Sequence, residues 1–258
     1  MEGRIPHFVK SLKRLAVAAL LLGGCGPPDP MAQFQPGERG RVTRIVDGDA
    51  LVLDTGQSVR LIGIEAPAPE RRDRPGEDFA KESARMLEDM ALGREVRLYY
   101  AGLPRDRYDR ALAHAVPDDD LGPRFWLNRE MAAKGGARVR VYPDTALGSD
   151  ALVAAETAAR ESGLGLWARN AYEVRRASDL GEDVFRFQIV DGILGDTEPS
   201  EYGACERAML SSWLRLEIGP MAQDLCALPA GRRVEVRGYI SRGEMEVTHP
   251  LNLREVPR

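Results

Sequence analysis

Hydrophobic and polar positions alternate along most of this chain, and the alternation predicts short β-strands. From about Gly40, three such segments follow one another: RVTRIV, ALVLD and SVRLIGI, with a turn at Thr55-Gly56. A period of two places every second side chain on the same face of a strand. Three strands in hairpin succession therefore predict the start of a small β-barrel.

The period changes between residues 76 and 92, where the pattern predicts an amphipathic helix. Phe79, Ser83 and Leu87 fall on one face at helical spacing, and Gly93 ends the run. Two more strands, REVRLYY and RALAHAV, follow, and then a short helix over residues 125–134. Ser149 is a good N-cap for a last helix over residues 150–161. The expected order is β-β-β-α-β-β-α-α.

After Trp167 the sequence changes character and predicts a second domain. The segments RFQIVDGILG, WLRLEIG, RRVEVRGYI and MEVTHPLNL indicate short strands, with turns between them and little helix signal. We therefore expect a mainly β protein with helices, made of one domain over residues 38–170 and a smaller β-rich domain over residues 172–258.

The N-terminal segment predicts export. Four basic side chains precede the apolar run 15–22, which is too short to span a bilayer comfortably. The run ends in Leu-Gly-Gly-Cys25, which resembles the bacterial lipobox, in which the cysteine is acylated and becomes the new N-terminus. We expect residues 1–24 to be a signal peptide, Cys25 to be a lipid anchor, and residues 25–37 to be a tether. An ordinary signal peptide with an incidental cysteine is the alternative.

These features predict a membrane-anchored lipoprotein of the cell envelope, facing the periplasm or the exterior. In an oxidising compartment the two remaining cysteines, Cys205 and Cys226, can form a disulfide; two reduced buried thiols are the other possibility. The chain has 36 Lys and Arg against 40 Asp and Glu, a formal charge of −4. No global basic field attracts nucleic acid, so any such contact must be local.

Three motifs carry candidate chemistry, although each has an ordinary structural explanation when taken alone. Asp-Gly-Asp49 joins two predicted strands, where a tight turn favours these residue types. Arg60 lies in a strand that leads to IEAPAPE, which contains Glu65 and Glu70. The third motif, RDRYDRALA, contains Arg110 in a turn where charges of both signs alternate.

Together and in this order, the motifs resemble the staphylococcal nuclease (thermonuclease) family. That family shows DGDT, RL.GID.PE and RD.YGR.LA, which stand here as DGDA, RLIGIEAPAPE and RDRYDRALA. The segments LGREVRLYY, LNREMAAKGGARV and AARESGLGLW are also similar to the family, and the resemblance covers about residues 38–170. It implies a five-stranded OB-type barrel and a calcium-dependent nuclease that hydrolyses phosphodiester bonds in DNA or RNA, leaving 3′-phosphate ends.

Carried over position by position, the resemblance implies separate roles for five side chains. Asp49 and Glu65 would hold Ca²⁺, which favours carboxylate oxygens. Arg60 and Arg110 would grip the scissile phosphate, because guanidinium groups stabilise the charge that develops on its oxygens. Glu70 would act as general base and activate the attacking water.

Several positions depart from the family pattern. Glu65 stands for an aspartate, Ala50 for a threonine and Asp109 for a glycine. Aligned without a gap, Ala68 takes the position of the catalytic glutamate, whereas a two-residue insertion gives that position to Glu70. Besides an active nuclease we therefore consider a catalytically impaired module that binds nucleic acid or protein, and a purely structural lipoprotein.

The C-terminal segment GRRVEVRGYISRGEMEVTHPLNLREV looks like the strands that close an OB-type barrel. Its aromatic side chains can either stack on the bases of a single strand or pack in the core, and core packing is the expectation for Phe185, Phe187, Trp213 and Tyr239. For His249 we expect a capping or turn role. We expect the protein to be a monomer.

Overall fold

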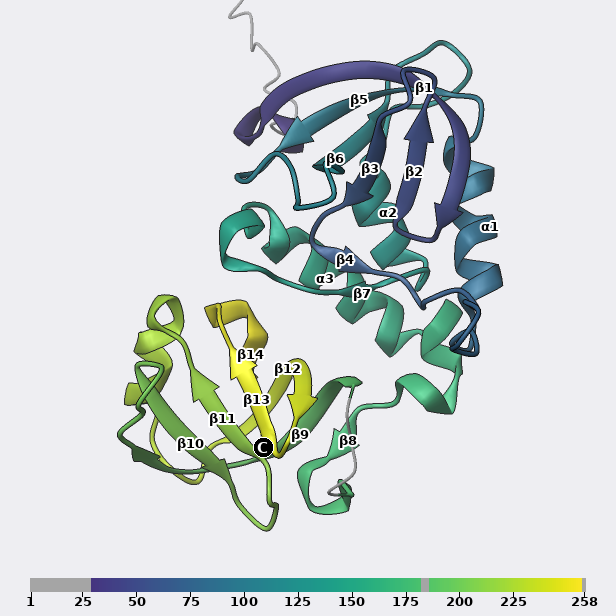
Figure 1. Ribbon diagram of the computed structural model, residues 1–258. Coiled ribbons are helices and arrows are strands. Elements are labelled where there is room, and N and C mark those ends of the chain that lie inside the picture. Colours follow the sequence, from purple (N-terminus) through teal and green to yellow (C-terminus); the bar gives the residue numbers. More distant parts are fainter. Residues whose placement is uncertain (1–28, 182–185, 257–258) are drawn as a thin grey trace, which may run out of the picture. The chain divides into compact units, whose positions relative to one another are not determined.

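The computed structural model describes residues 29–181 and 186–256 (Figure 1). The predicted signal peptide, Cys25 and Phe185 lie outside the described residues. Contacts between Cα atoms divide the chain into Met1–Ala32 and Gln33–Arg258. The second of these units contains two β-barrels.

The first barrel is closed by five strands in the order β1-β2-β3-β6-β5. These strands are β1 (Gln35–Asp47), β2 (Ala50–Leu53), β3 (Ser58–Leu61), β5 (Glu95–Tyr100) and β6 (Ala111–Pro117). Only β3 and β6 run parallel; the other four pairs are antiparallel. This is the strand order of an OB fold, which confirms the predicted class.

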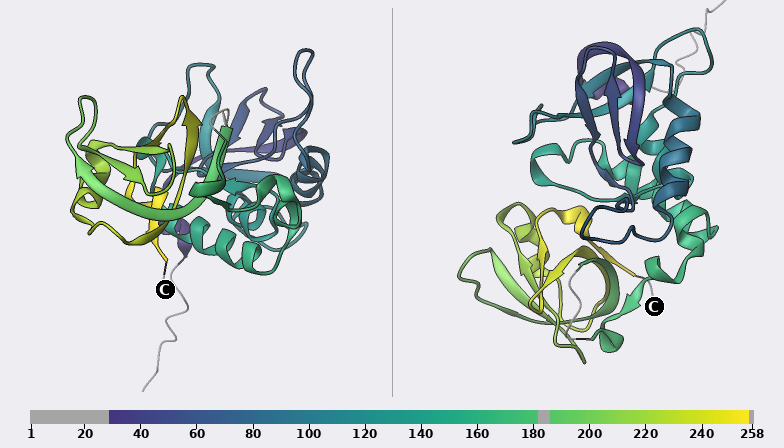
Figure 2. Two further views of the ribbon diagram at one scale, coloured as in Figure 1. Left: turned by 90° about the horizontal axis from the view of Figure 1, so that it is seen from below. Right: turned by 45° about the vertical axis from the view of Figure 1, so that its right-hand side comes forward.

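The helices of this domain agree with the predicted order. They are α1 (Ala80–Ala91), α2 (Leu127–Ala133) and α3 (Ser149–Glu161). In α1, Ser83, Leu87 and Ala91 are buried on one face, as the spacing predicted. Figure 2 shows α1 lying along the side of the barrel. The N-cap expected at Ser149 is wrong: Gly148 is the N-cap, with φ of +80°, and Ser149 is already helical and buried.

The predicted strand SVRLIGI is interrupted. It ends as β3 at Leu61, because Gly63 has φ of +75° and turns the chain away from the barrel. Residues beyond the turn form β4 (Ile64–Glu65), which pairs with β7 (Arg138–Val139) in a separate two-stranded sheet. The break therefore places Glu65 outside the barrel that carries Arg60.

The second barrel has the same strand order. Its strands are β9 (Arg186–Glu198), β10 (Cys205–Met209), β11 (Arg215–Ile218), β12 (Arg233–Ser241) and β13 (Glu244–Val247). They pair in the order β9-β10-β11-β13-β12, and β12 returns to β9; β11 and β13 are the parallel pair. The predicted OB-like second domain is therefore confirmed. Two short strands, β8 (Arg175–Arg176) and β14 (Leu253–Glu255), extend the sheet.

Short 3-10 helices connect these elements. They are η1 (Pro30–Gln33), η2 (Pro143–Thr145), η3 (Gly165–Ala168), η4 (Asn170–Tyr172), η5 (Ala177–Asp179), η6 (Pro220–Ala227) and η7 (Pro250–Asn252). His249 is the N-cap of η7, and its Nδ1 accepts from the backbone N–H of Leu251 at 3.2 Å. No helix within residues 29–181 or 186–256 is both long and apolar enough to cross a membrane.

A disulfide joins the second barrel to η6. Cys205 on β10 and Cys226 on η6 are bonded, with an S–S distance of 2.00 Å. Cys205 belongs to a buried cluster whose members include Leu216, Val236 and Val247. Trp213 packs against this cluster, and its indole N–H donates to the Leu180 carbonyl at 2.8 Å. Trp213 thus has the packing role expected of it.

Candidate active site

The turn between β1 and β2 buries two carboxylates beside one another. Gly48 makes this turn possible, because a Cβ there would lie 1.8 Å from the Ser83 hydroxyl oxygen. The backbone N–H of Asp49 donates to Oδ1 of Asp47 at 3.1 Å, and Asp49 itself is only 1% exposed. The Asp-Gly-Asp sequence favours a tight turn between the two strands, and this turn also buries the side chain of Asp49.

Asp49 is buried with one oxygen only partly satisfied. Its Oδ2 accepts from the backbone N–H of Ala66 at 2.6 Å. Its Oδ1 lies 2.7 Å from Nη1 of Arg60 but accepts no well-aligned hydrogen bond from a described residue. Burial raises the pKa of Asp49 well above its usual value; Arg60 opposes the shift and Asp47 adds to it. A cation at Oδ1 would favour the ionised form, so this carboxylate suits a hard metal ion.

Arg60 and Arg110 line one groove of about 1120 Å³, which we call the arginine groove. Its charged lining consists of Arg60, Arg71, Arg105, Arg107 and Arg110, opposed by Asp106 and Asp144. Neither Arg71 nor Arg107 has an ion-pair partner in the described part of the chain. The protein is acidic overall, yet this groove carries a local excess of positive charge, which is what binding of a phosphate backbone requires.

The loop between β5 and β6, residues 101–110, holds Arg110 in place. The carboxylate of Asp106 accepts from the backbone N–H of Arg110 at 3.0 Å and from its Nε at 2.7 Å. Burial acts to raise the pKa of Asp106, but these hydrogen bonds outweigh it and lower the pKa. Asp109 adopts φ of +60°, a left-handed conformation that favours glycine. The structure thus explains why a glycine suits this position.

Glu65 lies close to this site but is already paired. Its Oε2 contacts Nη1 of Arg140, and its Oε1 lies 3.8 Å from Nη2 of Arg138. Burial acts to lower the pKa of Arg60. Nearby carboxylate charges, including those of Asp49 and Glu65, outweigh burial, so the pKa of Arg60 is raised. The two carboxylates therefore act on the same arginine, although Glu65 would have to release Arg140 before it could bind a metal ion.

Glu70 lies on the exposed loop that follows β4. Its side chain forms no hydrogen bond or ion pair with any described residue. The next residue, Arg71, lines the arginine groove, so the loop brings Glu70 to its edge. The structure brings Asp49 and Arg60 into contact and places Arg110 on the same groove, but it does not bring Glu70 into contact with them.

Glu77 is a carboxylate that the motifs did not single out. Its backbone N–H donates to the Ala68 carbonyl at 2.9 Å, and its Oε2 accepts from the Ala68 N–H at 2.8 Å. The side chain is 42% exposed and lies 3.9 Å from Nη2 of Arg138. A carboxylate therefore lies against Ala68, where the ungapped register would put the catalytic glutamate. Glu77 and Ala68 are joined across a loop, so the periodicity of the sequence could not predict their contact.

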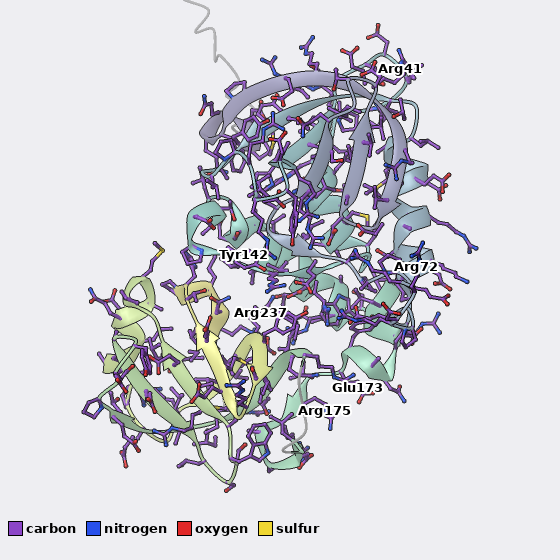
Figure 3. The ribbon with its side chains drawn as sticks, viewed as in Figure 1. Arg41, Arg72, Tyr142, Glu173, Arg175 and Arg237 are labelled. Atoms are coloured by element: carbon purple, nitrogen blue, oxygen red, sulfur yellow. A yellow bond between two sulfur atoms is a disulfide. The ribbon has the colours of Figure 1, made fainter. Side chains whose placement is uncertain are left out.

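Tyr142 follows β7 and lines the same groove (Figure 3). Tyr108 lies in the loop 101–110 and is 65% exposed, with the Arg107 guanidinium 4.8 Å from its ring centre. Exposed aromatic rings beside arginines can stack on nucleobases. Among the described residues, no group of three or more His, Cys, Asp or Glu side chains is arranged to hold a metal ion.

Comparison with known proteins finds similarity to nucleases. Residues 58–169 match the model of the family described as staphylococcal nuclease homologue. The chain is similar to the thermonuclease of Staphylococcus intermedius, with 29% identity over 60% of this chain and 94% of that protein. It is also similar to the thermonuclease of Staphylococcus hyicus, with 30% identity over 40% of this chain and 59% of that protein.

A third relative is the probable endonuclease lcl3 of Pyrenophora tritici-repentis, with 32% identity over 43% of this chain and 41% of that protein. The chain thus spans nearly the whole of the first relative but less than two thirds of the other two. The matched region contains Arg60, Glu65, Glu70 and Arg110, whereas Asp49 precedes the family match.

Proposed function

We propose that the protein is a nuclease that hydrolyses phosphodiester bonds in DNA or RNA, since residues 58–169 match the family model described as staphylococcal nuclease homologue. The observation that carries the proposal is the arginine groove, in which Arg60 on β3 and Arg110, just before β6, face the same space. Two guanidinium groups from different elements can bind one phosphate from two sides and stabilise the charge that builds on its oxygens.

We propose that the site uses Ca²⁺, with Asp49 and Glu65 as its protein ligands. The buried Oδ1 of Asp49, which accepts no well-aligned hydrogen bond, is the feature that fits a hard cation. When bound, the ion would neutralise charge on the phosphate. Nη1 of Arg60 lies 2.7 Å from the same oxygen, so a cation bound there would compete with that guanidinium and leave it available to a phosphate.

For the general base we propose Glu70, which the loop carries to the edge of the arginine groove. The base removes a proton from the attacking water, and losing it typically costs about 10²- to 10⁴-fold in rate. Glu77 is the other candidate to compare with Glu70, because its carboxylate accepts a hydrogen bond from the backbone N–H of Ala68. Glu70→Gln should abolish most of the cleavage, whereas Glu77→Gln should loosen the loop and have the smaller effect; the reverse order would assign the base to Glu77.

The alternative is a catalytically impaired module that binds nucleic acid without cutting it. The pairing of Glu65 with Arg140 and Arg138 favours this reading, since it occupies a proposed metal ligand. Such a module should retain oligonucleotide binding in Glu70→Gln and show no cleavage in any variant.

The test is cleavage of single-stranded DNA by the full chain with Ca²⁺ or with a chelator. Asp49→Ala should lose calcium-dependent cleavage, because its carboxylate is the one buried at the site. Arg129→Ala is the matched control, an exposed arginine on α2 outside the arginine groove. Cleavage that persists in the chelator and in Asp49→Ala would contradict the calcium proposal.

We propose further that the protein is a lipoprotein anchored in the membrane through Cys25. The support is the sequence around the cysteine. Labelling with a radioactive fatty acid tests it: the native chain should incorporate label, and Cys25→Ala should not. Equal labelling of both would refute the anchor.

A further inference from the structure

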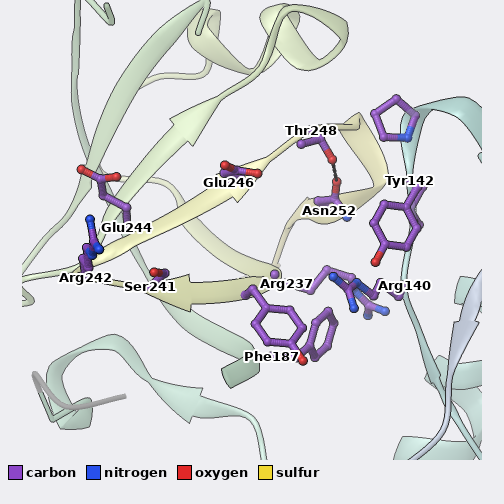
Figure 4. A pocket seen from close by; sticks show the side chains of 14 residues that line it. Arg140, Tyr142, Phe187, Arg237, Ser241, Arg242, Glu244, Glu246, Thr248 and Asn252 are labelled. Atoms are coloured by element: carbon purple, nitrogen blue, oxygen red, sulfur yellow. Dashed lines mark hydrogen bonds between the residues drawn. The ribbon is translucent and has the colours of Figure 1, made fainter. Parts of the chain in front are cut away.

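A second groove adjoins the arginine groove, and Tyr142 lines both. We call it the tyrosine groove; it measures about 540 Å³. Its other walls come from the segment that contains Arg140 and from strands β12 and β13 of the second barrel (Figure 4). A ligand that leaves the arginine groove past Tyr142 therefore meets the second barrel next.

The floor of the tyrosine groove near Tyr142 is a stack of one guanidinium between two rings. The Arg140 guanidinium lies 4.7 Å from the ring centre of Tyr142 and 4.6 Å from that of Tyr239. Tyr142 is 45% exposed and Tyr239 is 43% exposed, so each tyrosine keeps much of its surface open to a ligand. Phe187 lies beneath, with its ring centre 6.1 Å from that of Tyr239, and is only 5% exposed.

Buried ion pairs hold β12, which carries Tyr239, against the first domain. Arg237 on β12 lies 2.5 Å from Glu156 on α3, and both side chains are at most 4% exposed. Glu235 on the same strand accepts from Arg160 at 2.6 and 2.7 Å. Removing one member of a buried pair is costly, so the two walls of the tyrosine groove are fixed relative to each other.

The charges in the tyrosine groove differ from one end to the other. Glu244 and Glu246 on β13 would repel phosphates, and Figure 4 shows Glu244 at the end opposite Tyr142 and Arg140. The end near Tyr142 therefore suits a nucleic-acid strand better. Ring faces can stack only on bases that are unpaired, because the bases of a duplex already stack on each other.

From these observations, and resting on the proposed nuclease function, we propose that the second barrel binds the same substrate strand. One single-stranded segment runs from the arginine groove past Tyr142 and stacks a base on Tyr239. Five-stranded OB barrels bind oligonucleotides with the loop between their fourth and fifth strands. In the second barrel Arg242 lies in that loop and lines the tyrosine groove, but at the end that carries Glu244 (Figure 4). The proposed path therefore uses Tyr239 on β12 and not this loop.

The test measures binding separately from cleavage. The full chain is titrated, in the presence of a chelator, with fluorescent oligothymidylates of about 4 and about 12 nucleotides, within the footprint of ~4–16 nucleotides that an OB fold covers. Tyr239→Ala should weaken binding of the longer strand about 5- to 150-fold, which corresponds to the ~1–3 kcal/mol that one base stacked on an aromatic ring contributes. It should weaken the shorter strand less.

Two variants control for folding and for surface tyrosines in general. Tyr239→Trp keeps a large ring over Phe187 and should bind as well as the native chain or better. Tyr202→Ala removes an 83% exposed ring in the loop 199–204 of the same barrel and should leave binding unchanged. Equal affinity of Tyr239→Ala and the native chain, equal losses in Tyr239→Ala and Tyr202→Ala, or equally tight binding of a duplex would overturn the inference.

This experiment distinguishes the two proposals. If binding depends on Tyr239 but calcium produces no cleavage, the strand path holds and the nuclease proposal fails. If calcium-dependent cleavage occurs and Tyr239→Ala binds normally, the nuclease proposal holds and the strand path fails.

Discussion

The two barrels of this protein share one strand order but differ in the loops that an OB fold uses for binding. In the first barrel the turn between β1 and β2 supplies Asp49, and the loop of residues 101–110 between β5 and β6 supplies Arg105, Arg107 and Arg110. In the second barrel the corresponding connections are residues 199–204 and 242–243. The shared fold thus does not determine the chemistry; the loop sequences do.

The helix between the third and fourth strands differs as well. In the first barrel it is α1, an amphipathic α-helix that buries Ser83, Leu87 and Ala91. In the second barrel it is the 3-10 helix η6, which buries only Ala222 and is tied to β10 by the disulfide. The comparison indicates that packing stabilises the helix of the first barrel, whereas a covalent bond replaces part of that packing in the second.

The largest expected difference between the barrels is the stability that the first barrel loses at low pH. His114 is fully buried between the rings of Phe34 and Trp126, and burial lowers its pKa to about 3. Below pH 6.5 the His114 side chain binds a proton in the unfolded chain but not in the folded chain. The free energy of unfolding therefore falls as the pH falls towards 3, and at pH 4 it should be about 3 kcal/mol lower than at pH 7.

Denaturant unfolding at pH 7 and pH 4 measures this loss, and His114→Leu should remove its histidine-dependent part. The second barrel has no histidine in its buried cluster, so probes in that barrel should respond less over the same range. An identical loss in the native chain and in His114→Leu would refute the prediction.

The disulfide should matter to the second barrel alone. Cys205 and Cys226 close a loop with a sequence separation of 21, for which loop closure gives about 3 kcal/mol of stabilisation. Replacing both cysteines by alanine should lower the midpoint of unfolding followed by the fluorescence of Trp213, which packs on the same cluster. The first barrel, followed by amide exchange of its strands, should be unaffected; loss of protection there as well would contradict the comparison.

The smallest expected effect concerns one residue of the loop 101–110. Asp109→Gly should relieve the left-handed backbone at φ of +60° and stabilise the chain by about 1 kcal/mol or less. It also removes a negative charge next to Arg110, so substrate binding should tighten slightly. Asp109→Ala is the control, since it removes the charge but not the strain. Thermal unfolding that places the glycine variant below the alanine variant would exclude the strain explanation.

Much of this architecture could be predicted from the sequence. Period-two alternation located the strands, and helical spacing located α1, because both patterns are local. The three motifs also identified Asp49, Arg60 and Arg110 as candidates, of which the structure places the first two in contact and the two arginines on one groove. The β-rich character of the second domain followed from its alternating segments, and its OB type from the likeness of its C-terminal segment to the strands that close such a barrel.

The contacts of the loop after β4 could not be predicted, because they join residues far apart in sequence. Glu65 meets Arg138 and Arg140 only because β4 pairs with β7. Glu77 meets Ala68 across the loop, and nothing in the spacing of acidic residues indicates that contact. The tyrosine groove could not be predicted from the sequence either, since Tyr142 follows β7 and Tyr239 lies on β12 of the second barrel.

The most direct test of the central claim compares the same substitution in the two barrels. The full chain is given single-stranded DNA and Ca²⁺, beside Arg60→Ala on β3 and Arg215→Ala on β11, the third strand of each barrel. We expect Arg60→Ala to lower the cleavage rate about 10²-fold or more. Arg215, whose side chain pairs with Glu198 and Glu206, lies outside the arginine groove, so Arg215→Ala should cleave like the native chain. No cleavage by the native chain above a blank without protein, or equal rates in all three, would contradict it.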